Sequence, residues 1–265
     1  SLSYKPWPDT TLFASAARGY KGGGINLGFT GESVDPTFRP EQATSFELGV
    51  KSYLFKKLAS LSLTAYHTDI KDYQALTFDN EPTLLPNPRQ INLLNVGRVR
   101  LQGAELEGYG YLAEGLVMRG GVAYSRAVTS VFPNAPNEDT RENDKDLSGD
   151  DLYNAPRWSV VLGGQYRFAF ERGFDAYTGL DYMYRSGYWG TVEHGRASYI
   201  EAYDVVNLRF GLRAADRAWD VSLWARNLLD DDYVATVYPL YGVGDYGAVP
   251  ADPVTYGLTM RVLLQ

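Results

Sequence analysis

Few side chains in this sequence are of the types that catalyse reactions. The chain has no cysteine, which excludes disulfide frameworks, thiolate metal sites and cysteine nucleophiles. Its only two imidazoles are His67, two residues before Asp69, and His194, directly after Glu193. An acid beside a histidine can activate water for hydrolysis. We favour the simpler interpretation, in which both histidines are exposed or hydrogen-bonded side chains at a rim, and we assign no catalytic residue.

Two acidic runs have a spacing that could hold a cation. Asp144 and Asp146, followed by Ser148 and a glycine, place oxygen ligands at alternate positions, as in the first half of a calcium loop. The twelfth position of such a loop would be Ala155, so the closing acid is absent. The contiguous aspartates at 230–232 fit the end of a strand better than a metal cluster. We therefore predict no metal site and no cofactor.

The elements that would position these groups are strands with one apolar and one polar face. Segments 204–213 and 219–226 form a predicted β-hairpin around a short polar turn. One face of its first arm is apolar and the other is polar, with Val206, Leu208, Phe210 and Leu212 opposite Asn207, Arg209 and Arg213. A charged face on two neighbouring strands suggests a sheet whose inner surface is wet. A transmembrane β-barrel has this property, because its outside meets lipid and its lumen meets water or polar side chains.

Eight more segments alternate in the same way, which gives about ten strands. They are 11–20, 45–51, 61–66, 99–109, 116–124, 158–166, 176–184 and 254–264. The connections alternate strictly between short turns and long loops, so all the short turns fall at one end. Outer-membrane barrels have short periplasmic turns and long extracellular loops. A soluble β-sandwich has no physical reason to sort its loops in this way.

Composition agrees with a barrel. The chain is 45% hydrophobic, yet its mean hydropathy is -0.29 and it has no long apolar run, which excludes a transmembrane helix. A barrel strand needs no such run, because every second residue points to the lumen. The 21 tyrosines and 5 tryptophans suit membrane interfaces. A net charge of -7 argues against a nucleic-acid partner.

Five stretches, in this order and at these spacings, resemble the C-terminal half of the barrel of TonB-dependent outer-membrane receptors. They are RGYKGGGIN from Arg18, FRPEQATSFELGVKS from Phe38, TAYHTDIKDYQ from Thr64, NVGRVRLQGAELE from Asn95 and LWARNLLDDDY from Leu223. The resemblance implies an antiparallel up-and-down barrel of about 22 strands closed around an N-terminal plug. Residues 1–265 would then be the C-terminal part of the barrel domain, without the plug and the early strands.

The resemblance also implies a function and partners. Such receptors bind a scarce solute, most often a ferric siderophore, and import it with energy that TonB delivers through a box on the plug. The chain would lie in outer-membrane lipid of a Gram-negative bacterium, inserted by the barrel-assembly machinery. That machinery reads a C-terminal aromatic residue in most members, whereas this sequence ends in Gln265. The departure predicts either altered recognition or a few further residues.

Charged and aromatic side chains supply the candidate contacts. Seven charged residues would face the lumen, where we expect ion pairs between strands and contacts to the plug: Glu47, Glu105, Glu107, Asp181, Arg185, Arg209 and Arg226. Aromatic and cationic groups suit an anionic, ring-bearing iron chelate. The predicted ligand-binding residues are Arg18, Lys21, Arg185, Tyr188, Trp189, His194 and Arg196.

Two alternatives stay open at this point. One is a complete small outer-membrane barrel, acting as a passive pore or as an omptin-like protease. The other is a soluble β-rich binding module.

Overall fold

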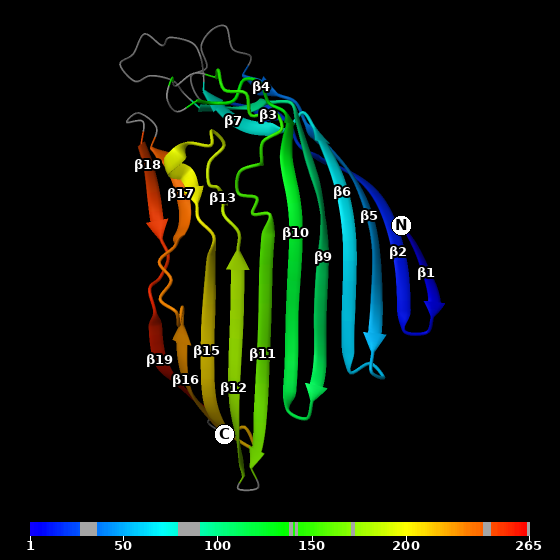
Figure 1. The fold of residues 1–265 in the computed structure, drawn as a ribbon, viewed down its shortest axis with the longest axis vertical. Helices are drawn as coiled ribbons and strands as arrows, with labels where there is room; N and C mark the ends of the chain where they lie inside the picture. The colour runs from blue at the N-terminus through cyan, green and yellow to red at the C-terminus, as the bar shows by residue number, and fades with distance from the viewer. Residues whose placement is uncertain are drawn as a thin grey trace.

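A single antiparallel sheet of eleven strands dominates the computed structural model, which describes residues 1–26, 36–78, 91–137, 140, 143–170, 173–240 and 245–263 (Figure 1). Each strand pairs with the next long strand along the chain. In sheet order the strands are β1 (Leu2–Trp7), β2 (Thr10–Lys21), β5 (Glu41–Leu54), β6 (Ala59–Lys71), β9 (Arg98–Ala113), β10 (Leu116–Val131), β11 (Trp158–Phe170), β12 (Phe174–Arg185), β15 (Tyr203–Ala214), β16 (Trp219–Arg226) and β19 (Thr255–Val262). The predicted all-β, up-and-down architecture is confirmed.

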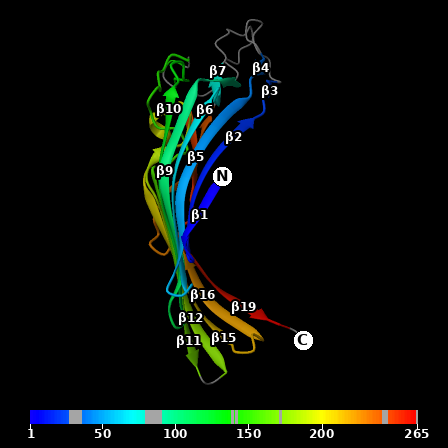
Figure 2. The ribbon, with the colours of Figure 1, turned by 90° about the vertical axis from the view of Figure 1, so that its right-hand side faces the viewer.

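The sheet is curved but not closed. Figure 2 shows its middle strands on the convex side and its two outer strands, β1 and β19, at the open edges. Within the described residues, these two strands each pair on one side only. No helix in this part of the chain is long and apolar enough to cross a membrane.

The prediction of ten strands missed β1. This strand contains Pro6, which lacks the backbone N–H that a ladder position donates and so weakens the strand signal. Its pairing with β2 shifts register between Tyr4 and Trp7, on either side of that proline. At the other end, β19 stops at Val262, whereas the predicted strand ran to Leu264. Leu264 and Gln265 lie outside the described residues, as does the start of the predicted turn at 171–173.

The sorting of connections by length is confirmed. Short turns follow β1, β5, β9, β11 and β15, and all lie at one end of the sheet, while the long connections gather at the other end (Figure 1). The prediction that the long connections are plain loops is wrong, because four of the five contain a short strand pair. These pairs are β3 (Gly24–Ile25) with β4 (Thr37–Phe38), β7 (Gln74–Phe78) with β8 (Ile91–Asn95), β13 (Tyr188–Trp189) with β14 (Tyr199–Ile200), and β17 (Val234–Leu240) with β18 (Asp245–Pro250). The strands β3, β4, β13 and β14 are each two residues long, which is too short to produce a period-two pattern.

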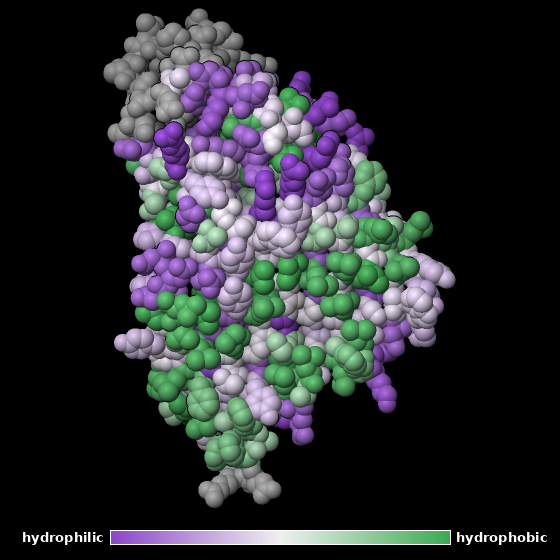
Figure 3. Space-filling view, in the orientation of Figure 1, coloured by the Kyte–Doolittle hydropathy of each residue, from purple (hydrophilic) through white to green (hydrophobic). Residues whose placement is uncertain are grey.

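The register separates the two faces of the sheet. One row of directly paired residues crosses six strands and consists of Leu12, Val50, Leu63, Leu106, Val122 and Val160. Its members lie on the convex face, where Figure 3 shows a hydrophobic band over the middle and lower part of the sheet. Aromatic pairs stand at two levels of this face, Tyr124 with Trp158 and Phe170 with Phe174. An apolar band with aromatic borders is the surface that a bilayer requires.

The two faces should respond differently to a charge. Leu63 is 46% exposed on the convex face, and the adjacent Thr64 points to the concave face beside Glu105. Leu63→Arg should lower the free energy of unfolding by roughly 2–4 kcal/mol, because an arginine at mid-belt enters hydrocarbon. Thr64→Arg should cost under about 1 kcal/mol, because the added cation meets a carboxylate. A urea titration of the protein in lipid vesicles, followed by its heat-modifiable gel shift, measures both. Equal losses would contradict the assignment of the faces.

Candidate functional site

The concave face carries the polar side chains that the sequence places in the lumen. Strand alternation puts all seven predicted charged residues on this face. Two of the expected ion pairs between strands are present. Asp181 accepts a hydrogen bond from Arg119 at 3.2 Å, across the intervening strand β11. The residue between them is Gly163, where a Cβ would come within 2.8 Å of the Asp181 carboxylate and 2.9 Å of the Arg119 guanidinium. Only a glycine lets this pair close.

A second, more buried group lies near the short-turn end of the same face. The Tyr177 hydroxyl donates to both carboxylate oxygens of Asp220, at 3.0 and 3.1 Å. Arg213 donates to Asp220 at 2.8 Å, while Arg209 lies 3.7 Å from Asp220 and donates to Ser222 at 2.8 Å. Both guanidinium groups stack over the Tyr177 ring. The sequence indicated the face of each residue, but it did not predict that Asp220 would contact two arginines and a tyrosine.

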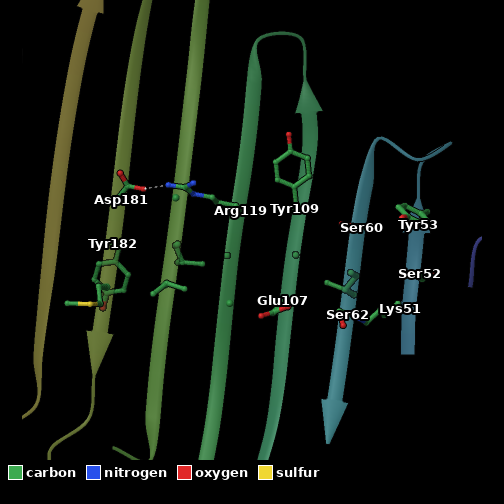
Figure 4. Close-up of a pocket in the computed structure, with 18 of the residues that line it drawn as sticks. Lys51, Ser52, Tyr53, Ser60, Ser62, Glu107, Tyr109, Arg119, Asp181 and Tyr182 are labelled. Carbon is green, nitrogen blue, oxygen red and sulfur yellow. Dashed lines mark hydrogen bonds and ion pairs between the residues drawn. The ribbon is translucent and has the colours of Figure 1, made fainter. Parts of the chain in front are cut away.

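The concave wall is hollowed in front of strands β5 to β15. A depression of about 770 Å³ opens there (Figure 4). Figure 4 shows the Arg119–Asp181 pair at its edge and the side chains of Lys51 and Glu107 on neighbouring strands. Its polar lining includes Lys51, Ser62, Glu107, Tyr109, Arg119 and Asp181. The wall therefore offers both signs of charge to whatever occupies the lumen.

At the loop end, the connection 186–202 holds four of the seven predicted ligand-binding residues. The Trp189 ring stacks on His194 with centroids 5.0 Å apart and an interplanar angle of 7°, and it meets Tyr199 edge-on at 5.0 Å. His194 and Tyr188 are each only 8% exposed, so both rings help to build the loop. Arg196 is exposed and lies in a short 3-10 turn, η1 (Arg196–Ser198), beside this stack.

Neighbouring loops hold this connection in place. Lys145, in the loop 132–157, donates from its Nζ to the backbone oxygens of Glu193 at 2.8 Å and His194 at 3.2 Å. The backbone N–H of Asn154 donates to Trp189 O at 2.7 Å. An apolar cluster of Ala75, Phe132, Ala135 and Leu147 packs against Val192, and so joins three loops. Sequence reasoning missed the role of Lys145, because that lysine lies in a run that looks solvated.

The remaining predicted residues are spread along the strand ends. Arg185 ends β12 on the concave face, and Lys21 ends β2 on the concave face opposite Glu41. Arg18 lies on the convex face, in alternation with Leu12, and donates to Gln42 at 2.7 Å. The structure thus brings together Tyr188, Trp189, His194 and Arg196. For Arg18, a contact with ligand stays a prediction that its position does not support.

The acids for which we predict no metal site take part in local hydrogen bonds. The Asp144 carboxylate accepts from Asn137 and Thr140, both at 2.8 Å, and these bonds lower its pKa. Asp146 accepts from the backbone N–H of Ser148 at 2.8 Å. His67 lies 3.0 Å from Asp69, as the sequence suggested. Among the described residues, no group of three or more histidines and acids is arranged to hold a metal ion.

The Asn-Leu-Leu-Asp run that starts at Asn227 closes the turn after β16. Asn227 is 4% exposed, and its amide donates to the backbone oxygens of Asp231 and Asp252 and accepts from the N–H of Asp231. Asp230 accepts from the N–H of Val254 at 2.8 Å. These contacts hold Asp230 and Asp231 in the turn after β16, which itself ends at Arg226.

Known proteins share the sequence and the fold of this chain. A family model described as "TonB dependent receptor-like, beta-barrel" matches residues 1–228. Among curated proteins, the metal-pseudopaline receptor CntO of Pseudomonas aeruginosa is 29% identical over 183 residues, which are 68% of this chain and 22% of that protein. The catecholate siderophore receptor Fiu of Escherichia coli is 26% identical over 237 residues, or 88% of this chain and 27% of that protein. The chain thus spans about a quarter of the length of these relatives.

Solved structures show the same fold. The ferric yersiniabactin uptake receptor FyuA of Yersinia pestis superposes with a TM-score of 0.77 at 19% identity, over 98% of this chain and 36% of that chain. The siderophore receptor PiuA of Acinetobacter baumannii gives a TM-score of 0.72 at 17% identity, over 97% of this chain and 34% of that chain.

The buried imidazole makes the loop 186–202 sensitive to acid. Burial, with a smaller contribution from the nearby Lys145 charge, lowers the pKa of His194 to about 4 against the opposing effect of Asp150. The unfolded loop binds a proton near pH 6.5 while the folded loop does not, so stability is complete above pH 6.5 and falls as the pH drops toward 4. The loss should approach roughly 3 kcal/mol.

Amide hydrogen exchange across residues 186–202 measures this loss between pH 7 and pH 4.5. His194→Asn is the matched variant, because asparagine tolerates the left-handed backbone at this position, where φ is 50°. It should exchange faster at neutral pH but show no added acid dependence. The same acid dependence in both proteins would assign the effect to another group.

Proposed function

Because the chain belongs to the TonB-dependent receptor-like β-barrel family, we propose that it is part of a receptor that imports a ferric siderophore with energy delivered through TonB. The observation that carries the proposal is the match of the family model over residues 1–228. The chain is an outer-membrane protein of the Gram-negative type, and the family consists of transport receptors, so we assign it no enzymatic activity. Under this proposal, residues 1–265 are the C-terminal part of a barrel domain whose other strands pair with β1 and β19.

The class of solute follows from the relatives. CntO is described as a receptor for a metal-pseudopaline complex and Fiu as a receptor for catecholate siderophores. Both descriptions name a metal chelator as the ligand. Metal chelates of this kind are bulky, frequently anionic and often aromatic. The loop end of this chain combines a half-buried tryptophan with an exposed arginine, which suits such a ligand through stacking and charge-assisted hydrogen bonds.

Within the loop end we give the residues separate roles. Trp189 and Arg196 are the proposed ligand contacts on the loop 186–202, with Arg185 and Lys21 at the strand ends on the concave side. Tyr188 and His194 support them, since both side chains are buried and the His194 ring stacks on Trp189. Energy would reach a bound ligand through a plug in the lumen, where Lys51, Glu107 and the Arg119–Asp181 pair offer contacts. Insertion by the barrel-assembly machinery belongs to the same proposal.

Growth on defined iron sources tests the function. Deleting the gene should abolish growth on at least one ferric siderophore as the sole iron source, while growth on ferrous salts stays normal. Uptake of ⁵⁵Fe-labelled chelates measures the same loss directly. Unchanged uptake of every chelate offered would remove the siderophore assignment.

Point variants test the proposed contacts in the full-length receptor. Trp189→Ala and Arg196→Ala should each raise the Kd of the transported chelate about tenfold, because each removes a stacking or a charge-assisted contact worth roughly 1–2 kcal/mol. Arg217→Ala, in the short turn at the opposite end of the sheet, is the control and should leave the Kd unchanged. Binding is measured by quenching of intrinsic tryptophan fluorescence for the arginine variants and by filter binding of the labelled chelate for Trp189→Ala.

A further inference from the structure

Cations gather on one part of the convex face, above the hydrophobic band. They come from four strands, β2, β6, β9 and β10, and are Arg18, Lys71, Arg98, Arg100 and Arg126. We call these five residues the outer basic patch. The chain as a whole carries a net charge of -7, so this concentration runs against its composition. Figure 3 shows hydrophilic side chains over the same upper part of the face, above the green band.

The register places the patch on the outside of the sheet. Three successive rows of paired residues run across β5, β6, β9 and β10, each two residues above the last. The first joins Phe46, His67, Gln102 and Arg126; the second joins Thr44, Asp69, Arg100 and Val128, with Arg18 of β2 opposite Thr44; the third joins Gln42, Lys71 and Arg98. Every row has the same parity as the row of Leu48, Ala65, Ala104 and Tyr124 in the apolar band. No register shift interrupts β5, β6 and β9 over these rows.

The height of the patch matches the headgroup layer of a bilayer. The Tyr124 and Trp158 rings, 4.9 Å apart, lie at the upper edge of the apolar band, where aromatic residues border a membrane. Arg126 is the next residue on this face of β10, about 7 Å higher along the strand. Arg100 and Arg98 follow in rows about 7 and 14 Å above that. The cations therefore begin where hydrocarbon ends.

The patch is under-neutralised by the protein. On β5, β6, β9 and β10, Asp69 is the one acid on the convex face of these rows, and it pairs with Arg100 at 3.2 Å and with His67 at 3.0 Å. The next acid along the second row is Asp151, opposite Val128, and it is already paired with Arg157 at 2.9 Å. Arg18 donates only to the uncharged amide of Gln42. Within the described residues, Lys71, Arg98 and Arg126 have no hydrogen bond or ion pair from their side chains. Five cations against one carboxylate leave an excess of four positive charges facing the level of the lipid headgroups.

We propose that the outer basic patch binds the phosphate groups of an anionic lipid in the leaflet at the loop end. Guanidinium and ammonium groups recognise phosphate oxygens by charge-assisted hydrogen bonds. Lipid is the occupant because the patch continues directly from the lipid-facing band, so a headgroup lies against it whenever the barrel is in a membrane. The inference depends on the membrane placement of the sheet and is independent of which solute the receptor imports.

Native mass spectrometry of the full-length receptor tests the proposal, with bisphosphorylated lipid A, its dephosphorylated analogue and inorganic phosphate as probes. The triple variant Lys71→Gln, Arg98→Gln, Arg126→Gln should weaken binding of the bisphosphorylated lipid about 100-fold, at roughly fivefold for each cation near an anionic surface. It should fold, because these three side chains make no polar contact among the described residues. The dephosphorylated lipid should bind both proteins weakly and equally.

A second triple variant controls for total charge. Arg167→Gln, Arg226→Gln and Arg261→Gln removes three cations from the concave face, which lipid does not touch, and should leave lipid affinity unchanged. The gel shift of each variant on heating confirms that it is folded. Retained affinity in the convex triple, equal losses in both triples, or equal binding of the dephosphorylated lipid would each overturn the proposal. If inorganic phosphate binds and the convex triple variant loses this binding too, the proposal is also overturned, because the patch is then a site for free anions and not for lipid.

Discussion

Backbone hydrogen bonding in a medium without water is the constraint on which this structure depends. An unpaired N–H or C=O costs several kcal/mol in hydrocarbon, so strands can enter a membrane only when a neighbour satisfies each of them. Nine of the eleven strands pair on both sides within the described residues, and only β1 and β19 have one partner. The same ladder fixes which side chains meet lipid. A slip of one residue between β6 and β9 would turn Glu105 and Glu107 outward and Leu106 inward.

The loop end obeys a different rule, because water reaches it. Its connections need no continuous ladder, and they are held by small apolar clusters and by side chains that reach across from one loop to the next. Lys145 caps two backbone oxygens of the loop 186–202, and Asn227 ties the turn after β16 to the segment before β19. The buried His194 stacks on the half-buried Trp189 and holds that ring in place. Rigid support of this kind lowers the entropy that ligand binding has to overcome.

The sequence predicts well those features that depend on the alternation of apolar and polar residues within one strand. The faces of Glu47, Asp181 and Arg209 follow from period-two patterns within single strands, and the sorting of loops follows from counting those strands. Contacts between segments far apart in the chain are beyond such patterns. The backbone oxygen of His194 accepts a hydrogen bond from Lys145, 49 residues away, and the Asp220 carboxylate accepts one from Tyr177, 43 residues away. Arg18 follows the same rule, since it continues the alternation of Leu12, Ala14 and Ala16, which places it on the outer face.

Charged side chains have protein partners on the concave face but few on the convex face, and one physical reason explains the difference. On the concave wall, carboxylates lie close to guanidinium groups from neighbouring strands, and the most buried of them, Asp220, has a hydroxyl and an arginine within 3.1 Å. Removing such charges from bulk water requires internal partners. On the convex face, the rows of the apolar band carry no charged residue from β2 to β11, and cations gather above the aromatic edge, where Lys71, Arg98 and Arg126 stand without acids of their own. A surface at that height meets headgroups that can supply the counter-charge, so the protein does not need to carry it.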